Sequence, residues 1–279
     1  MKLDFDDISF LIHSAFEEDL KDGDITSNNI IPLGKEGKAS MRAKEDGVIA
    51  GLEVVNEVFN YHDEDINYKP LVDEGQWVKK GDIIAVMYGP YRSLLIAERI
   101  ALNFLQRMSG IATETHKYVA ETKGTKAKIL DTRKTLPAFR HLDKYSVFAG
   151  GGTNHRIGLY DMVMIKDNHI KMAGSITKAV EQVRLHIPNS IKIEVETTTF
   201  EEVEEAVASD VDIIMLDNMD NNLTRKCVEF INGRAKVEAS GNMTLDRIAS
   251  VAETGVDFIS VGAITHSVKA LDISMNFVG

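Results

Sequence analysis

The sequence is poor in cysteine, in positive charge and in long apolar runs. Its one cysteine, Cys227, excludes an internal disulfide and a zinc cluster built on cysteines. The 279 residues carry a formal net charge of −11, which argues against a nucleic-acid binder because phosphate binding needs a basic surface. No stretch is apolar over the length that spans a bilayer, and the acidic N-terminus is unlike a signal peptide. We therefore expect a cytoplasmic globular protein without nucleic-acid or membrane partners.

The first part of the chain changes from helical to strand-like patterning. Apolar residues recur at helical spacing over 8–16. Short apolar or alternating runs separated by turn residues follow over 37–89, around one predicted helix at 52–60. A long helical pattern covers 93–122, as one helix or as two joined near 109–110. These features predict a small β-rich unit followed by a long helical segment.

The rest of the chain alternates between strand-length apolar runs and helical patterns. This alternation favours a parallel sheet with crossover helices, and six strands in one unit favour a barrel over an open sheet. The predicted strands are 128–130, 162–165, 191–195, 211–216, 235–238 and 257–261. The predicted helices are 176–186, 199–208, 223–231 and 245–253.

Polar or glycine residues follow every one of these apolar runs. In a βα barrel such positions converge on one rim, where the site lies. The cations there, Arg133, Lys134 and Lys166, suit a substrate with carboxylates or phosphates. Glu196 and Asp217 suit Mg²⁺. Backbone amides after the last two strands suit a phosphate. The residues there are Ser240, Gly241 and Asn242 after one strand and Gly262 and Ala263 after the other. The rim therefore predicts a polyanionic substrate, a metal and a phosphate.

Motifs along nearly the whole chain resemble the quinolinate phosphoribosyltransferase family. In family order they include Glu98-Arg99, Asp131-Thr132-Arg133-Lys134-Thr135, Gly150-Gly151-Gly152, Asn154-His155-Arg156, Lys166-Asp167-Asn168-His169, Glu194-Val195-Glu196, Leu216-Asp217-Asn218 and Gly262-Ala263-Ile264-Thr265-His266-Ser267. Each motif is weak alone, and the ordered set is highly specific. The resemblance implies an α/β fold with an N-terminal α/β sandwich domain over 1–113 and an incomplete, TIM-like α/β barrel over 114–267. The C-terminal tail, 268–279, would return to the first domain.

The resemblance also implies an activity and an assembly. The reaction joins quinolinate to phosphoribosyl pyrophosphate with Mg²⁺ and yields nicotinate mononucleotide, pyrophosphate and CO₂, a step of NAD biosynthesis. The implied assembly is a homodimer, alone or within a hexamer, in which one subunit covers the barrel mouth of the other.

The family motifs also imply a role for each site residue. Arg99 would bind quinolinate in the partner's site, and Arg133, His155 and Arg156 would hold the two quinolinate carboxylates with Thr132 nearby. The implied catalytic residues are Lys134 and Lys166, facing the ring carboxylate and phosphoribosyl pyrophosphate, and Glu196 and Asp217, on the ribose hydroxyls and the metal. The 5′-phosphate would lie against Ser240, Gly241, Asn242, Val261, Gly262 and Ala263.

Two departures from the family pattern and three alternative functions accompany this interpretation. Ala138 stands where the family usually has glycine, and Phe148 where a basic residue is usual. The alternatives are a barrel lyase or aldolase with Lys166 or Lys134 as Schiff-base nucleophile, a relative of the same fold such as the molybdenum-operon homologue or a nicotinate-type phosphoribosyltransferase, and a non-catalytic binding protein.

Overall fold

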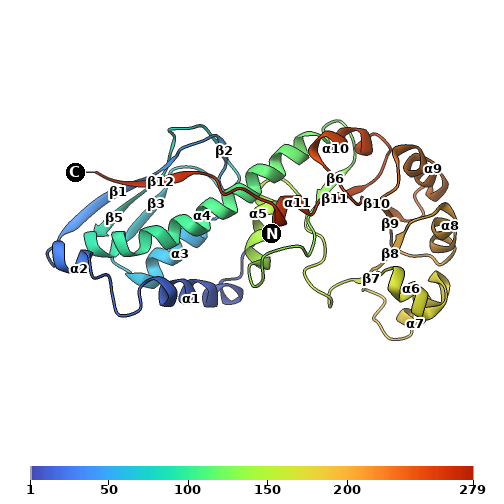
Figure 1. Ribbon diagram of the computed structural model, residues 1–279, viewed down its shortest axis with the longest axis horizontal. Coiled ribbons are helices and arrows are strands. Elements are labelled where there is room, and N and C mark those ends of the chain that lie inside the picture. The colour runs from blue at the N-terminus through green and yellow to red at the C-terminus, as the bar shows by residue number, and fades with distance from the viewer. Residues whose placement is uncertain (1, 279) are drawn as a thin grey trace. The chain divides into compact units, whose positions relative to one another are not determined.

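The computed structural model describes residues 2–278, which pack as two units (Figure 1). The first unit consists of Met1–His116, Leu136–Gly151 and Ser267–Gly279, and the second of Lys117–Thr135 and Gly152–His266. The main difference from the predicted domains, 1–113 and 114–267, is that the segment 136–151 packs with the first unit although it interrupts the second in sequence; the boundaries also fall after 116 and 266. Within residues 2–278, no helix combines the length and the apolar character needed to cross a membrane.

The first unit is built on a four-stranded antiparallel sheet. Its strand order is β12-β1-β5-β3, with β1 Glu36–Ala43, β3 Asn67–Pro70, β5 Ile83–Pro90 and β12 Ile273–Val278. A two-stranded sheet pairs β2 Gly47–Val48 with β4 Trp77–Val78. The helical elements are η1 Phe5–Asp7, α1 Ser9–Asp19, α2 Ser27–Ile30, α3 Leu52–His62, α4 Tyr91–Ala120 and α5 Arg140–Ala149. The return of β12 to pair with β1 confirms the predicted α/β sandwich with its C-terminal strand.

Helix α4 runs without a break through Ser109 and Gly110, so the pattern over 93–122 is one helix. The Ser109 hydroxyl accepts a hydrogen bond of 3.0 Å from the Ala50 amide. A Cβ atom at Gly110 would lie 2.3 Å from the Lys269 carbonyl oxygen, so glycine here lets the returning chain approach the helix. Both residues thus serve the packing of the first unit, not a turn.

The segment 136–151 joins the first unit through a buried ion pair. Asp143, which is 1% exposed, accepts hydrogen bonds from the Arg107 guanidinium at 3.1 and 2.8 Å. Burial raises the pKa of Asp143, and the hydrogen bonds from Arg107 oppose this shift. The two positions of family departure also lie here. Ala138 has a φ of +67°, in the left-handed region that favours glycine, and Phe148 is exposed on α5.

The second unit is a curved, six-stranded parallel sheet in the order β6-β11-β10-β9-β8-β7. Its strands are β6 Lys128–Leu130, β7 Val163–Ile165, β8 Ile193–Thr197, β9 Ile213–Asp217, β10 Lys236–Ser240 and β11 Phe258–Ser260. Its helices are α6 Asp167–Ala173, α7 Ile176–Arg184, α8 Phe200–Ala208, α9 Asn221–Ile231, α10 Leu245–Ala252 and α11 Ala263–His266. The sheet does not close between β6 and β7, which confirms the predicted incomplete barrel.

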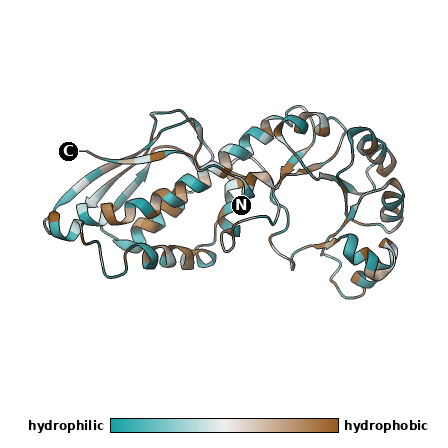
Figure 2. Ribbon diagram, viewed as in Figure 1, coloured by the Kyte–Doolittle hydropathy of each residue, from teal (hydrophilic) through white to brown (hydrophobic). Residues whose placement is uncertain are grey.

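Helices α7, α8, α9 and α10 lie on the outer side of the sheet (Figure 1). They are amphipathic, with hydrophobic and hydrophilic stretches alternating along them (Figure 2). On α8 the buried side chains are Val203 and Ala206, and on α10 they include Ile248 and Val251. Because these apolar faces cover the outside of the sheet, the inner face and the carboxyl ends of the strands remain for polar side chains.

Candidate active site

The carboxyl ends of the six strands surround a cavity of about 640 Å³ within the second unit. Its lining contains nearly all of the predicted barrel site residues: Thr132, Arg133, Lys134, His155, Arg156, Lys166, Glu196, Asp217, Ser240, Gly241, Asn242, Gly262 and Ala263. Val261 is buried, and its amide donates to the Leu130 carbonyl. Arg99 lies exposed on α4 in the first unit, so its contact with a partner's substrate stays a prediction.

A second cavity, of about 600 Å³, lies at the opposite ends of the strands. Lys126, Lys236 and Asp257 are part of its lining, and none of the predicted site residues is. Sites of βα barrels lie at the carboxyl ends of the strands, and residues at the other end contribute mainly to stability. The cavity at the carboxyl ends of the strands is therefore the candidate active site.

Four cations gather in the active-site cavity: Arg133, Lys134, Arg156 and Lys166. The Arg156 guanidinium donates to the Met162 carbonyl at 3.0 Å, and its other amino group lies 3.6 Å from the Met164 sulfur. Burial and the neighbouring Arg133 lower the pKa of Arg156, although arginine stays protonated. Two guanidinium groups held this close repel each other. A bound dianion relieves this repulsion, so the pair suits a substrate with two carboxylates.

Thr132 has a structural part in this arrangement. Its hydroxyl oxygen accepts a hydrogen bond of 3.1 Å from the Lys134 amide, which turns the chain directly after β6. The Lys134 carbonyl in turn accepts from the Thr265 hydroxyl at 2.8 Å. These two contacts fix the backbone from which Arg133 and Lys134 extend.

Two carboxylates face the same cavity from β8 and β9. Glu196 pairs in register with Met215, two residues before Asp217 on β9. The Lys166 ammonium lies 3.2 Å from a Glu196 oxygen, and Asp217 accepts from the Asn218 amide group at 2.8 Å. Among the described residues, the only group of three metal-ligating side chains within bonding reach of one ion is His155, Glu194 and Glu238, of which His155 and Glu238 line this cavity, and it does not include Glu196 or Asp217. Glu196 and Asp217 thus fit Mg²⁺, which binds few protein carboxylates and takes its other ligands from substrate and water.

A rigid turn follows β10 at the predicted phosphate subsite. Gly241 has a φ of +93°, and a Cβ atom there would lie 2.3 Å from the Asn218 side-chain oxygen. The same oxygen accepts from the Asn242 amide group at 3.1 Å, and the Asn218 main-chain amide donates to the Ser240 carbonyl at 2.9 Å. The turn thus requires glycine at 241 and is locked to the end of β9. Such turns hold backbone amides in place for an anion.

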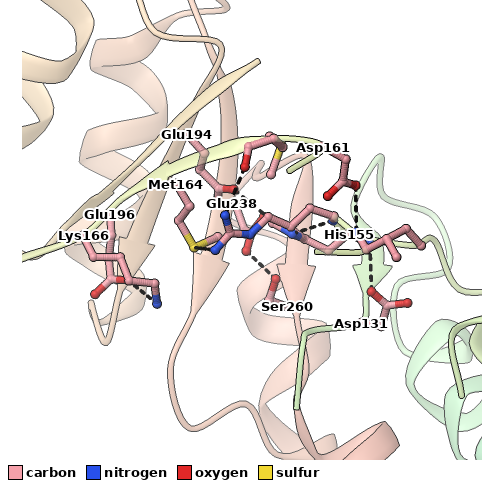
Figure 3. Close-up of polar contacts among 12 residues, drawn as sticks. Asp131, His155, Asp161, Met164, Lys166, Glu194, Glu196, Glu238 and Ser260 are labelled. Atoms are coloured by element: carbon pink, nitrogen blue, oxygen red, sulfur yellow. Dashed lines mark hydrogen bonds and ion pairs between the residues drawn. The ribbon is translucent and has the colours of Figure 1, made fainter. Parts of the chain in front are cut away.

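Beneath the cations lies a buried polar layer that the sequence did not reveal (Figure 3). The His155 side chain, 7% exposed, donates from Nε2 to Glu194 at 2.9 Å, and Glu238 lies 3.4 Å from the same nitrogen. Glu238 also accepts from the Ser260 hydroxyl. The signal in the sequence was a glutamate inside each of two predicted strands, Glu194 in 191–195 and Glu238 in 235–238, at positions whose side chains face the site. Charged residues are usually exposed, so this pattern alone does not indicate burial.

The protonation of His155 follows from its partners. Burial lowers the pKa of His155, but hydrogen bonds and charge from Glu194 and Glu238 outweigh burial and raise the pKa to about 10. Nδ1, however, accepts a hydrogen bond of 2.8 Å from the Arg156 amide, which can only donate. This bond requires a lone pair on Nδ1, which an imidazolium lacks. The geometry therefore holds the ring in its neutral form with the proton on Nε2, between the imidazole and Glu194, against the direction in which the two carboxylates shift the pKa. Both ring nitrogens are therefore engaged within the protein.

Comparison with known proteins identifies the family. The sequence model of "Quinolinate phosphoribosyl transferase, C-terminal domain" matches residues 111–276, and that of the N-terminal domain matches 24–109. The chain belongs to the quinolinate phosphoribosyltransferase family. This confirms the resemblance seen in the motifs, and the matched ranges include every predicted site residue.

Individual members of the family are similar over most of their length. The chain is 44% identical to the nicotinate-nucleotide pyrophosphorylase [carboxylating] of Oryza sativa, covering 96% of this chain and 77% of that protein. It is also 44% identical to quinolinate phosphoribosyltransferase [decarboxylating] 2b of Nicotiana tabacum, covering 96% and 82%. The nicotinate-nucleotide pyrophosphorylase structure from Francisella tularensis matches with a TM-score of 0.93 at 40% identity, covering 99% and 98%. These matches confirm the predicted fold.

Proposed function

We propose that this chain transfers the phosphoribosyl group of phosphoribosyl pyrophosphate to quinolinate and releases pyrophosphate, CO₂ and nicotinate mononucleotide. Membership in the quinolinate phosphoribosyltransferase family gives the reaction. The observation that carries the assignment to this site is the gathering of four cations and two carboxylates around one cavity at the strand ends. A substrate with two adjacent carboxylates and a second with several phosphates together need such a site.

In the first step, the ring nitrogen of quinolinate attacks the anomeric carbon, a C–N bond forms, and the C–O bond to pyrophosphate breaks. Positive charge develops at the ribose carbon, where Glu196 and Asp217 stabilise it and hold the ribose hydroxyls. Negative charge develops on the departing pyrophosphate, where Lys134 and Lys166 stabilise it. Arg133 and Arg156 orient quinolinate through its carboxylates. No covalent bond to the protein is needed.

In the second step, the carbon–carbon bond to the carboxylate beside the ring nitrogen breaks and CO₂ leaves. The electron pair that remains on the ring carbon is stabilised by the quaternary nitrogen and then takes up a proton. The proton comes from solvent, and the protein assists by holding the ring in place.

Glu196 and Asp217 are the residues that would hold Mg²⁺. When bound, the ion would neutralise charge on the phosphates and on the leaving pyrophosphate. A homodimer, alone or within a hexamer, and a cytoplasmic location are parts of the same proposal. The assembly rests on the motif resemblance, which gives Arg99 its role in the partner's site, and the location rests on the expectation drawn from the composition of the sequence.

One contact in the cavity favours phosphoribosyl transfer over the Schiff-base alternative. The Lys166 side-chain nitrogen lies 3.2 Å from a Glu196 oxygen, and attack of this nitrogen on a carbonyl substrate would break that ion pair. Borohydride treatment in the presence of a carbonyl substrate tests this point. Stable labelling of Lys166 would support the lyase or aldolase.

The experiment that tests the proposal is a turnover assay with quinolinate, phosphoribosyl pyrophosphate and Mg²⁺, with nicotinate and nicotinamide in parallel. We expect nicotinate mononucleotide and CO₂ in equal amounts from quinolinate, and no product from the other two. Product from nicotinate would indicate the nicotinate-type relative. Ligand binding without turnover would indicate a binding protein.

A further inference from the structure

The two buried glutamates under the active-site cavity come from strands on either side of β9. Glu194 on β8 pairs in register with Ile213 of β9, and Glu238 on β10 pairs with Met215 of the same strand. Both are 0% exposed, and Figure 3 shows them beside the His155 side chain. A carboxylate buried this deeply loses its hydration, which costs several kcal/mol unless the protein replaces it.

The replacement is incomplete. Among the described residues, Glu194 Oε1 has no hydrogen-bond partner, and the one group near Glu238 Oε2 is His155 Nε2, at the long distance of 3.4 Å. Glutamine, or apolar residues of similar size, would fill the same space without two like charges side by side. Burying two carboxylates side by side carries a free-energy cost, and an explanation for the pair has to come from what it contacts.

What the pair contacts is His155, and through it Arg156. Glu194 accepts the Nε2 proton of His155, and this fixes the ring with Nδ1 toward the main chain. Nδ1 then accepts from the Arg156 amide, which sets the backbone at the residue whose guanidinium faces the cavity. The imidazole is thus a rigid link between a buried anchor and the arginine.

A second support fixes the same segment from the other side. The His155 amide donates to Asp131 at 2.8 Å, and the Asn154 side chain donates to the other oxygen of Asp131 at 2.6 Å. The loop after the three glycines is thereby tied to the end of β6. Asp131 thus holds the backbone at His155, and the two glutamates hold the His155 imidazole.

We propose that Glu194 and Glu238 are positioning residues, which hold the His155 ring so that Arg156 is oriented for the carboxylates of quinolinate. This inference rests on the proposed function. It adds two fully buried residues, of which Glu238 belongs to the cavity wall. It also changes the role of His155, because the predicted contact of that ring with quinolinate would require one nitrogen to release its present partner.

The test compares Glu194→Gln and Glu238→Gln with the wild-type enzyme. Each substitution keeps the shape of the side chain and removes its charge. We expect KM for quinolinate to rise about tenfold or more, with KM for phosphoribosyl pyrophosphate changed less than twofold. Equal changes in both KM values, or unchanged KM for quinolinate in both variants, would overturn the proposal.

A double-mutant cycle separates positioning from general damage. If Glu194 acts through His155, then His155→Asn and Glu194→Gln together should raise KM for quinolinate no more than the larger single effect. Multiplied effects would contradict a shared role. Ser260→Ala, which keeps both charges and removes only the donor to Glu238, should raise KM for quinolinate in the same direction by a smaller factor. The Ser260→Ala variant keeps the proposal testable if a glutamine variant fails to fold.

Asp257→Asn is the matched control. Asp257 is also a buried carboxylate of the second unit, and it accepts hydrogen bonds from the Val237 amide and from Lys236, at the far ends of the strands. The Asp257→Asn substitution should lower the stability of the fold and leave KM for quinolinate and KM for phosphoribosyl pyrophosphate unchanged. A change in KM for quinolinate in this control would show that the KM readout follows stability and would overturn the inference.

Two further results keep the inference distinct from the function on which it rests. A wild-type enzyme inactive on quinolinate refutes the proposed function, whereas an active wild type with glutamine variants of normal KM refutes only the positioning role. Metal analysis of the purified enzyme completes the test, because the donor atoms of His155, Glu194 and Glu238 lie within 4.8 Å of one another. An ion retained by the wild type and lost from both variants would overturn the positioning role in favour of a metal site.

Discussion

Replacing Gly241 by alanine should weaken binding of phosphoribosyl pyrophosphate and leave quinolinate binding intact. Gly241 has a φ of +93°, and an added Cβ would lie 2.3 Å from the Asn218 side-chain oxygen and 2.9 Å from its main-chain nitrogen. The backbone atom cannot move aside independently, so the turn itself must shift. The positive φ costs an alanine about 1–2 kcal/mol, and the steric clash adds about 1–3 kcal/mol.

The matched control is Gly233→Ala. Gly233 has a φ of +77°, but no atom lies within 4 Å of its would-be Cβ, and it does not line the active-site cavity. Both substitutions therefore carry the cost of the positive φ, and only Gly241→Ala carries the clash. The difference between the two free energies of unfolding should be about 1–3 kcal/mol.

Steady-state kinetics with each substrate varied in turn provides the assay. For Gly241→Ala we expect KM for phosphoribosyl pyrophosphate to rise at least about tenfold, which corresponds to about 1.4 kcal/mol of lost binding. KM for quinolinate should change less than twofold, and Gly233→Ala should match the wild type for both. A normal KM for phosphoribosyl pyrophosphate in a destabilised Gly241→Ala enzyme would refute the assignment of this turn to the phosphate.

Four more predictions concern other parts of the molecule. Arg156→Lys removes the planar fork while keeping the charge, so KM for quinolinate should rise about tenfold in steady-state assays. Asp217→Asn should raise the Mg²⁺ concentration for half-maximal rate several-fold, and chelation should abolish wild-type turnover reversibly, both measured by metal titration. Burial raises the pKa of Asp257, but hydrogen bonds, first that from Lys236, outweigh burial and lower the pKa overall. The ionised Asp257 therefore stabilises the fold fully above the unfolded pKa of about 3.9, and this stabilisation is lost as pH falls through the lower folded pKa. Asp257→Asn should be less stable by about 1 kcal/mol at pH 7 in denaturant unfolding, with the difference shrinking toward pH 3. Ala138→Gly should gain up to about 1 kcal/mol in the same unfolding assay, because the native φ of +67° disfavours alanine.

The six barrel strands were predictable because short runs rich in apolar and β-branched residues alternate with helical patterns along the chain. The ends of β8, β9 and β10 were not, since the main-chain ladder continues past the residues at which these strands were expected to stop. Ser240 still pairs with Asp217 across β10 and β9, and Glu196 pairs with Met215 across β8 and β9. Residues expected to follow the strands thus lie in their last positions. The strands are thus longer than predicted at these ends, and the side chains still line the cavity.

Helix α5 and the buried glutamates could not be read from the sequence, for one shared reason. Asp143 on α5 and Glu194 on β8 are charged residues in buried positions, and their burial depends on partners distant in the chain. For Asp143 the partner is Arg107, and for Glu194 it is His155. No local pattern indicates such pairs, which form only when the fold brings the segments together.

The central claim is that the cavity at the strand ends transfers phosphoribosyl to a substrate with two adjacent carboxylates. The most direct measurement is kcat/KM for quinolinate, nicotinate and nicotinamide with saturating phosphoribosyl pyrophosphate and Mg²⁺, for the wild type and for Arg133→Ala. We predict turnover of quinolinate only, with CO₂ released in step with nicotinate mononucleotide and a loss of at least about 100-fold in the variant, as expected when a charge-assisted contact is removed. Equal turnover of nicotinate and quinolinate, or an Arg133→Ala enzyme as active as the wild type, would contradict the account.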